Sequence, residues 1–377
     1  MNITRLGAIA KKEFLQVLRD PRSLMIALLM PLVQMLMLGY GVSLDIKHVP
    51  LCVWDREASQ QSESLIKSFS ASQYFEIAKG LRNYQQLTNA IDSGSCRIAI
   101  VIPPDFSLRL NDSGTSSVQA IVDATDDNTA SVAAGYAQAV VAAFSNQVQL
   151  DASSAQGRPA AITPLSVQSR VWFNEDLESK NFIIPGLCAM ILALVGAQLT
   201  SLTVSREWER GTMELLISTP VTPMEVMLGK LLPYFAIGLF DAGLCIVLAL
   251  FWFQVPFRGT FFTLFVTTAL FLVVVLGIGY LISVSIRSQL GASQIALLLT
   301  MLPTTLLSGY TFPIDQMPGP IRAVTYLVHA RYYVTILKGV FLKGLGLTQL
   351  AMPIFALTLY AAVITFFAAR AFRKTLE

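Results

Sequence analysis

Six apolar runs, each long enough to cross a bilayer, constrain the fold of this chain most strongly. They lie at residues 24–42, 182–204, 231–253, 261–286, 293–312 and 351–369. A transmembrane helix needs about 20 mostly apolar residues, and helices suit lipid because they satisfy their own backbone hydrogen bonds. The sequence therefore predicts an α-helical polytopic membrane protein with six transmembrane helices.

The composition agrees with a membrane protein and excludes several other classes. Of the 377 residues, 54% are apolar and 14% are charged, whereas soluble domains carry about 25% charged residues. The apolar content excludes a disordered chain, and the net charge of +3 excludes a nucleic-acid partner. Four cysteines without zinc-ligand spacing predict no metal site.

The distribution of basic residues predicts the orientation of the chain. The run at 24–42 follows 23 residues and precedes no cleavage site, so we expect an anchor rather than a secretory signal. Six spans place both termini on one side. Twelve Lys and Arg residues lie on that side, and five lie in the short segments opposite. By the positive-inside rule, both termini are predicted to be cytoplasmic.

Residues 43–181 form a domain-sized insertion between the first and second spans. Its net charge is −5, against +8 for the rest of the chain. Apolar runs predict strands at 49–55, 96–104, 116–125 and 165–173. Helices are expected from the end of the first strand to about residue 69 and from 127 to about 149, and a linker at 151–160. We therefore expect an extracytoplasmic α/β domain. Cys52 and Cys96 lie at strand edges there, and either form a disulfide or remain two buried thiols.

The first 23 residues are predicted to form a cytoplasmic interfacial amphipathic helix. Residues 5–19 place apolar side chains such as Leu6 and Val17 on one helical face. Glu13 falls on the same apolar face, where a carboxylate needs a partner or must lose its charge. A partner protein or a loop arginine would supply the partner; alternatively, Glu13 reaches water by tilting.

The loop at 205–230 combines charged residues with a short amphipathic helix. Gly211 interrupts the preceding span, Thr212 is placed to cap the short helix, and Pro220 ends it. Thr222 and Glu225 stand in capping-box register for the next helix. The density of charge favours a docking surface, and the alternative is a plain surface hairpin.

Ionisable and polar residues inside the spans mark candidate translocation sites. Asp241 in the third span is the clear case, and Gln198 and Gln294 are weaker ones. Asp241 either lines a polar pathway or pairs with another helix.

The segment at 313–350 is rich in proline and aromatic residues, and its apolar pieces are too short to span a bilayer. It is predicted to form outer re-entrant or interfacial helices, either gating an exit or anchoring Tyr326, Tyr332 and Tyr333 at the membrane surface. His48 and His329 are expected at the interface. The chain contains no phosphate loop and no hydrolase motif, so we expect no enzymatic activity and no bound cofactor.

Several motifs in order resemble the ABC-2 type exporter permeases. The resemblance begins with Glu207, Glu209, Gly211, Thr212, Glu214, Leu215, Leu216, Thr219 and Pro220, and continues in KKEFLQVLRDPRSL at 11–24, IPPDF at 102–106, VDATDDNTA at 122–130, RVWFN at 170–174, GKLLPY at 229–234 and LLSGYTFPIDQMP at 306–318. These resemble the multidrug-efflux subgroup with a large periplasmic domain. Trp208 and His329-Ala330 depart from the pattern, which commonly has a basic residue and Asn-Pro at these places.

The resemblance implies a permease in the bacterial inner membrane, paired with itself or with a sister chain. Separate ATPase subunits would bind ATP and magnesium and dock on the cytoplasmic loop, and periplasmic or outer-membrane efflux components are a further class of partner. The implied coupling residues are Glu13, Glu207, Glu209, Arg210, Gly211, Thr212, Glu214, Leu215, Leu216 and Pro220, and the outer-gate candidates are Ser308, Gly309, Phe312 and Pro313. The exported substrate would be a drug, lipid or other amphiphile. A membrane sensor or envelope-assembly protein, whose outer domain binds a ligand without transport, is the alternative function.

Overall fold

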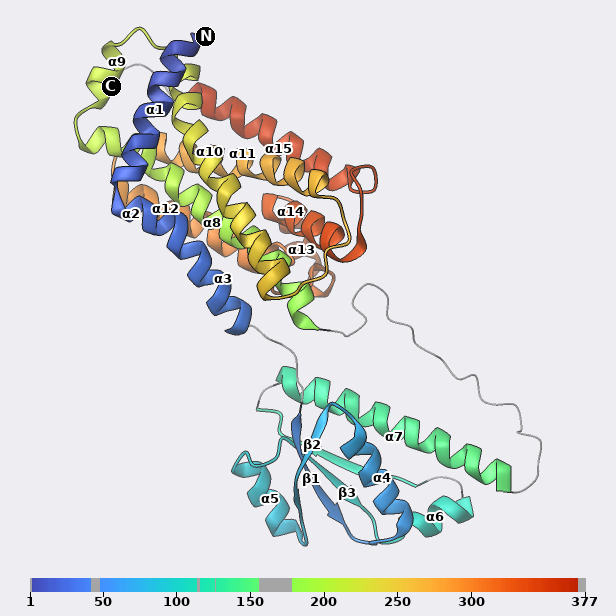
Figure 1. The fold of residues 1–377 in the computed structure, drawn as a ribbon. Helices are drawn as coiled ribbons and strands as arrows, with labels where there is room; N and C mark the ends of the chain where they lie inside the picture. Colours follow the sequence, from blue (N-terminus) through green and yellow to red (C-terminus); the bar gives the residue numbers. More distant parts are fainter. Residues whose placement is uncertain (1, 42–47, 114–115, 126, 156–177, 372–377) are drawn as a thin grey trace. The chain divides into compact units, whose positions relative to one another are not determined.

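The computed structural model describes residues 2–41, 48–113, 116–125, 127–155 and 178–371. The chain divides into two compact units (Figure 1): Met1–Leu44 with Arg170–Glu377, here called the membrane unit, and Asp45–Ser169, the inserted unit. Each unit is described by itself.

The membrane unit opens with two helical segments joined at an elbow. Helix α1 (Ile3–Arg19) begins at Asn2, whose side chain accepts a hydrogen bond from the Thr4 amide. Asp20 separates it from α2 (Pro21–Leu24), where proline suits the first helical position. A π-helical turn at Met25–Leu29 leads into α3 (Met30–Gly41).

Five described helices are long and apolar enough to cross a membrane. They are α8 (Ser179–Glu209), α10 (Pro223–Val247) with a π-helical turn to Trp252, α11 (Phe261–Ser285), α12 (Gln289–Leu307) and α15 (Ala351–Ala371). The apolar helix Met25–Gly41, at the position of the first expected span, is shorter. The apolar runs thus coincide with helices, five of which reach spanning length.

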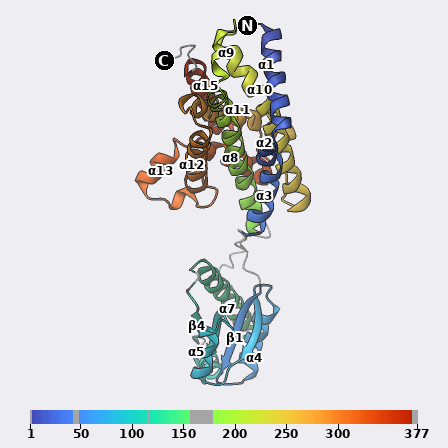
Figure 2. The same cartoon turned by 90° about the vertical axis from the view of Figure 1, so that its left-hand side faces the viewer.

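Helix α8 forms the centre of the membrane unit. Figure 2 shows it between α3 on one side and α12 on the other, and it also packs against α10, α11 and α14. Small residues allow the closest of these approaches: a Cβ atom added at Gly279 of α11 would lie 2.4 Å from the Ala197 carbonyl oxygen of α8. Almost every side chain of α8 between Asn181 and Glu207 is buried as a result.

Two helix ends differ from their predicted positions. Helix α8 continues to Glu209, five residues beyond the apolar run, because Arg206 pairs with Asp20 of the elbow and Glu207 with Lys230 of α10. Helix α12 ends at Leu307 rather than at residue 312, since Gly309 adopts a left-handed backbone conformation with φ +78°.

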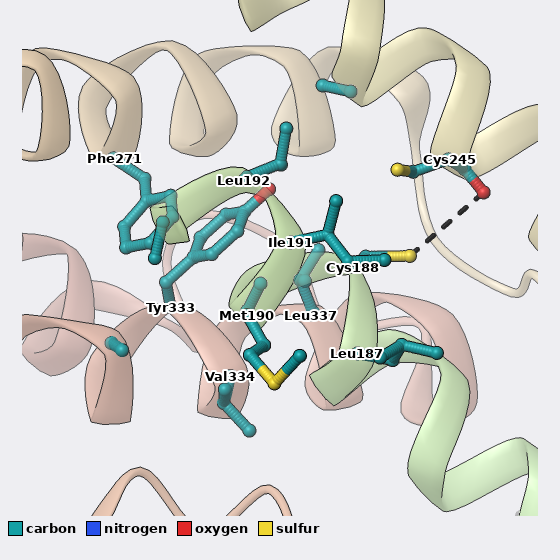
Figure 3. Packing of buried hydrophobic residues seen from close by; sticks show 14 of the residues in the cluster. Leu187, Cys188, Met190, Ile191, Leu192, Cys245, Phe271, Tyr333, Val334 and Leu337 are labelled. Carbon is teal, nitrogen blue, oxygen red and sulfur yellow. Dashed lines mark hydrogen bonds between the residues drawn. The ribbon is translucent and has the colours of Figure 1, made fainter. Parts of the chain in front are cut away.

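The segment after α12 folds back into the membrane unit. It contains α13 (Gly319–Thr325) and α14 (His329–Lys338), and α14 packs against α8, α11 and α15. Tyr333 stacks on Phe271 of α11 with ring centroids 4.0 Å apart, among α8 residues shown in Figure 3. The expectation of surface anchors is therefore wrong for Tyr333 and His329, which are buried in this apolar contact. Tyr326 is exposed.

The inserted unit is a four-stranded sheet with helices on both faces. The strand order is β2-β1-β3-β4, from β1 (Val49–Asp55), β2 (Phe75–Gly80), β3 (Ile98–Ile102) and β4 (Gln119–Val122). Strand β1 is parallel to β2 and β3, and β4 is antiparallel to β3. Alternate side chains face opposite sides, so Leu51 and Ile100 pack towards one helical layer while Cys52 and Ala99 pack towards the other.

Helices α4 (Gln60–Ala71) and α7 (Asp127–Ala155) cover one face, and α5 (Tyr84–Asp92) covers the other (Figure 1). Helix α6 (Phe106–Ser113) lies beside α4. The α/β prediction matches this fold, but the linker prediction is wrong for residues 151–155, which belong to α7. The rest of that linker and the strand predicted at 165–173 lie outside the described residues. Cys52 and Cys96 are buried with Cα atoms 5.8 Å apart, a separation that a disulfide spans, and their pairing stays a prediction.

Candidate functional site

A buried cluster of charges joins three helices at the end of the membrane unit that carries the N-terminus. Lys230 of α10 lies at its centre, with 1% of its side chain exposed. Its ammonium group donates to Glu13 of α1, to Glu207 Oε1 of α8 at 3.1 Å and to the Thr203 carbonyl oxygen at 3.2 Å. We call Glu13, Glu207, Lys230 and Lys12 the charge cluster.

Lys12 completes the charge balance of the cluster. Its Nζ atom donates to Glu207 Oε1 at 2.6 Å from a side chain that is half exposed, so two ammonium groups face two carboxylates. The Tyr234 hydroxyl lies 3.5 Å from Glu13 Oε2 and donates to it. Buried charges are tolerated when they are paired and hydrogen-bonded, and removing one partner is strongly destabilising. The cluster therefore fixes α1, α8 and α10 relative to one another.

Close packing of α1 on α10 brings Glu13 and Lys230 together. A Cβ atom added at Gly229 would lie 2.8 Å from the Ile9 Cβ atom, so α1 approaches α10 where α10 has no side chain. The apolar face of α1 carries Glu13 into this contact, where it is buried. Glu13 is therefore buried rather than tilted into water, and its partner is a lysine of the same chain, so the expectation of a partner protein or a loop arginine is wrong.

A sharp corner connects the charge cluster to the short helix α9 (Met213–Ser218). Gly211 adopts a left-handed conformation with φ +68°, which favours glycine and turns the chain after α8. The Thr212 hydroxyl donates to the Glu207 carboxylate and makes no capping bond to α9, so the predicted side-chain cap is wrong. The capping box of Thr222 and Glu225 is confirmed.

Helix α9 presents an exposed ridge on its outer side. Met213 is buried against the ends of α10 and α11, and Leu216 is half-buried. Glu214 is exposed, and Leu215 exposes 69% of its surface. Glu214 and Leu215 are therefore accessible on the outer side of α9.

The other predicted coupling residues lie at the same end of the membrane unit but outside the charge cluster. Glu209 is exposed and accepts a hydrogen bond from the Gln289 amide at 2.7 Å, at the start of α12. Arg210 is exposed at the corner, and the Pro220 carbonyl accepts a bond from Arg5. Trp208 stands where the family commonly has a basic residue. The guanidinium of Arg287 lies 4.6 Å from the centre of its ring, so a positive charge is still present beside this position.

Sequence reasoning missed Lys230 as a site residue. A signal existed, because Lys230 is a lone basic residue directly before a long apolar run and belongs to the GKLLPY motif. Which carboxylates it meets depends on the packing of α1 and α8, which periodicity does not specify.

The three intramembrane candidates do not form one site. Asp241 is buried, and within the described chain neither carboxylate oxygen has a hydrogen-bond partner. Gln198 donates to Ser293 of α12 at 3.4 Å. Gln294 is exposed, so the polar side chain of α12 that meets Gln198 is that of its neighbour Ser293.

Polar side chains follow the contact between α8 and α12, here called the α8–α12 seam. On α12 and the residue that caps its end they recur at helical spacing and lie on one face: Ser293, Thr300, Thr304 and Ser308. Of the outer-gate candidates, Ser308 is buried at the end of this face and the Gly309 carbonyl accepts a bond from Lys338 at 2.7 Å. Phe312 and Pro313 are exposed, so the structure does not bring the four together.

Comparisons with known proteins assign the family. The family model described as ABC-2 family transporter protein matches residues 22–370. The chain is 39% identical to the probable multidrug ABC transporter permease YbhS of Escherichia coli K12, over 90% of this chain and 89% of that protein.

Two further proteins of Escherichia coli K12 are similar to this chain over most of their length. Identity is 29% to the probable multidrug ABC transporter permease YbhR, covering 91% of each chain. Identity is 28% to the inner membrane transport permease YhhJ, covering 87% of this chain and 86% of that one. The chain therefore belongs to the ABC-2 transporter family and is an ABC-2 type permease.

Proposed function

We propose that this chain is the transmembrane subunit of an ATP-binding cassette exporter of the bacterial inner membrane. It moves an amphiphilic substrate, such as a drug or lipid, out of the cytoplasm or the inner leaflet. Separate ATPase subunits, which bind ATP and magnesium, dock on α9. The observation that carries this proposal is the charge cluster, because it connects α9 to three helices of the membrane unit at once.

The contacts define a route for force from α9 into the bundle. A displacement of α9 acts on Glu207 through Thr212, on α10 through Lys230 and on α1 through Glu13. Because the cluster is buried and charged, separating these groups is costly, and the three helices respond together. Docking at the exposed Glu214–Leu215 ridge is therefore expected to tilt the bundle rather than to bend α9 alone.

The α8–α12 seam is the proposed location of the translocation pathway. It carries hydroxyl groups along α12 and the amide of Gln198, whereas the neighbouring exposed faces of α12 are apolar except at Gln294. A second permease, either another copy or a sister chain, would pack against the exposed faces of α12 and complete the pathway. Asp241 remains a separate candidate, since buried ionisable groups in spans default to functional roles.

The first test is to purify the permease from its native membrane in mild detergent and identify the chains that accompany it. We expect a stoichiometric ATPase subunit and vanadate-sensitive ATP hydrolysis. Leu215→Asp should release that subunit, because it places a charge in the apolar part of the docking ridge. Leu108→Asp, at an equally exposed leucine of the inserted unit, is the matched control and should leave the complex intact.

A complex without any nucleotide-binding chain would overturn the proposal. The alternative function, a sensor or envelope-assembly protein acting through its outer domain, would then be favoured. Retention of the ATPase subunit by Leu215→Asp would overturn the docking site while leaving the exporter assignment in place.

A further inference from the structure

A polar hollow lies at the elbow between α1 and α2, separate from the α9 ridge. Its volume is about 500 Å³, and its lining comes from α1, the elbow and the C-terminal end of α8: Lys12, Leu15, Gln16, Arg19, Asp20, Pro21 and Arg210. This volume falls within the range of about 300–1,000 Å³ that is usual for ligand sites. We call it the elbow hollow.

The elbow hollow carries an excess of positive charge. Three cations line it against one carboxylate, that of Asp20, and this carboxylate is already paired with Arg206 at 3.3 Å. In the described part of the chain, Arg19 and Arg210 form no ion pair of their own. Two guanidinium groups that form no ion pair within the described residues, at a hollow whose one carboxylate pairs with Arg206, match a ligand with a phosphate group, which arginine binds in bidentate geometry.

The surroundings of the elbow hollow are those of a membrane surface. Leu15 in its lining and the adjacent Phe14 and Leu18 are exposed apolar residues of the amphipathic helix α1. Helix α1 ends at the elbow, and the apolar helix Met25–Gly41 begins five residues later. Lipid headgroups lie at the level where an interfacial helix meets a membrane helix.

We propose that the elbow hollow binds the phosphate headgroup of an anionic phospholipid of the inner leaflet, held by Arg19 and Arg210. The proposal rests on the proposed function in one respect, that this end of the membrane unit faces the cytoplasmic leaflet. Lys12 lines the hollow and also bonds Glu207, so a bound headgroup offers Lys12 a second anion. Lipid occupancy would thereby act on the charge cluster and on the coupling of α9.

Binding is tested with the full-length permease in mixed detergent micelles, using native mass spectrometry to count bound phosphatidylglycerol and phosphatidylcholine. We expect retention of phosphatidylglycerol over phosphatidylcholine. Arg19→Gln should weaken phosphatidylglycerol binding by about fivefold, the effect of one basic residue near an anionic surface. Lys11→Gln removes the same charge from an exposed position of α1 outside the hollow and should leave binding unchanged.

Two outcomes would overturn the proposal. Equal weakening by Arg19→Gln and Lys11→Gln would show non-specific attraction to the basic helix. Displacement of phosphatidylglycerol by an equal concentration of glycerol phosphate would show a site for soluble phosphates instead of lipids. Neither measurement needs an ATPase subunit or an oriented membrane, so failure of the exporter proposal leaves the binding result interpretable.

Discussion

Lys230 is the residue on which the structure of the candidate site depends. It is fully buried, and its ammonium group faces two carboxylates from two other helices. Its contribution to stability is best measured by removing it. The carboxylates then stay buried without their cation, which lowers the free energy of unfolding by more than the intact pair adds to it.

We predict that Lys230→Met destabilises the permease by about 3–5 kcal/mol, because Glu13 and Glu207 are left facing each other without their shared cation. The readout is the thermal unfolding midpoint of the purified protein. Lys12→Met removes the half-exposed cation of the same cluster and should cost at most about 1 kcal/mol. Similar losses in both variants would contradict a central role for Lys230.

At the scale of elements, the contact between α1 and α10 depends on one missing side chain. Gly229 lies against Ile9, whereas a Cβ atom added at Gly243 of the same helix would meet nothing within 4 Å. Gly229→Val should therefore push α1 away from α10 and weaken the Glu13–Lys230 contact, at a cost of about 1–3 kcal/mol from overpacking. Limited trypsin digestion should cut after Lys11 several times faster in this variant.

Gly243→Val is the matched control for this change, because both variants place the same side chain in α10. Its digestion rate should equal that of the unchanged protein. Unchanged cleavage in Gly229→Val would show that α1 is held by contacts other than the packing at this glycine.

Periodicity and composition predict most of the elements but not their contacts. The apolar runs locate the long helices, and VPLCVWD and CRIAIVIPP locate two strands because buried strands are continuously apolar. Strand β2 is not predicted from the sequence, because it is an edge strand buried only at Phe75 and its sequence FEIAKG lacks an apolar run. The burial of Tyr333 is not predicted for a related reason: the short helix that carries it packs inside the bundle through contacts that are distant in sequence.

The candidate site shows the same limit. The sequence places Glu13 on an apolar face, which requires a partner, and marks the loop around Gly211 as a corner. It does not identify Lys230 as that partner, because the two residues are separated by 217 positions and meet only through helix packing.

For the molecule as a whole, the distribution of charge predicts that the inserted unit lies outside the membrane and that α9 lies on the cytoplasmic side. Leu215 in α9 and Leu108 in the inserted unit are both exposed leucines and suit a labelling experiment. We expect Leu108→Cys to react with a membrane-impermeant maleimide in intact spheroplasts. Leu215→Cys should react only after the membrane is opened.

The native cysteines limit the background of this experiment. Cys188 and Cys245 are buried, and Cys52 and Cys96 are buried and close enough to pair. Labelling of Leu215→Cys in intact spheroplasts, with protection of Leu108→Cys, would reverse the predicted orientation. It would also move Cys52 and Cys96 out of the oxidising compartment on which their predicted pairing depends.

The α8–α12 seam has a consequence for the wetting of the protein interior. The hydroxyls of Thr300 and Ser308 donate within α12 itself, to the carbonyl oxygens of Ala296 and Thr304. Drawing the two helices apart therefore leaves these bonds intact, while each hydroxyl oxygen can still accept from water. A seam built in this way can fill with water and dry again at little cost, whereas the charge cluster resists opening. Apart from the Gln198–Ser293 and Thr305–Met190 contacts across the seam, its hydration would then set how readily a pathway forms.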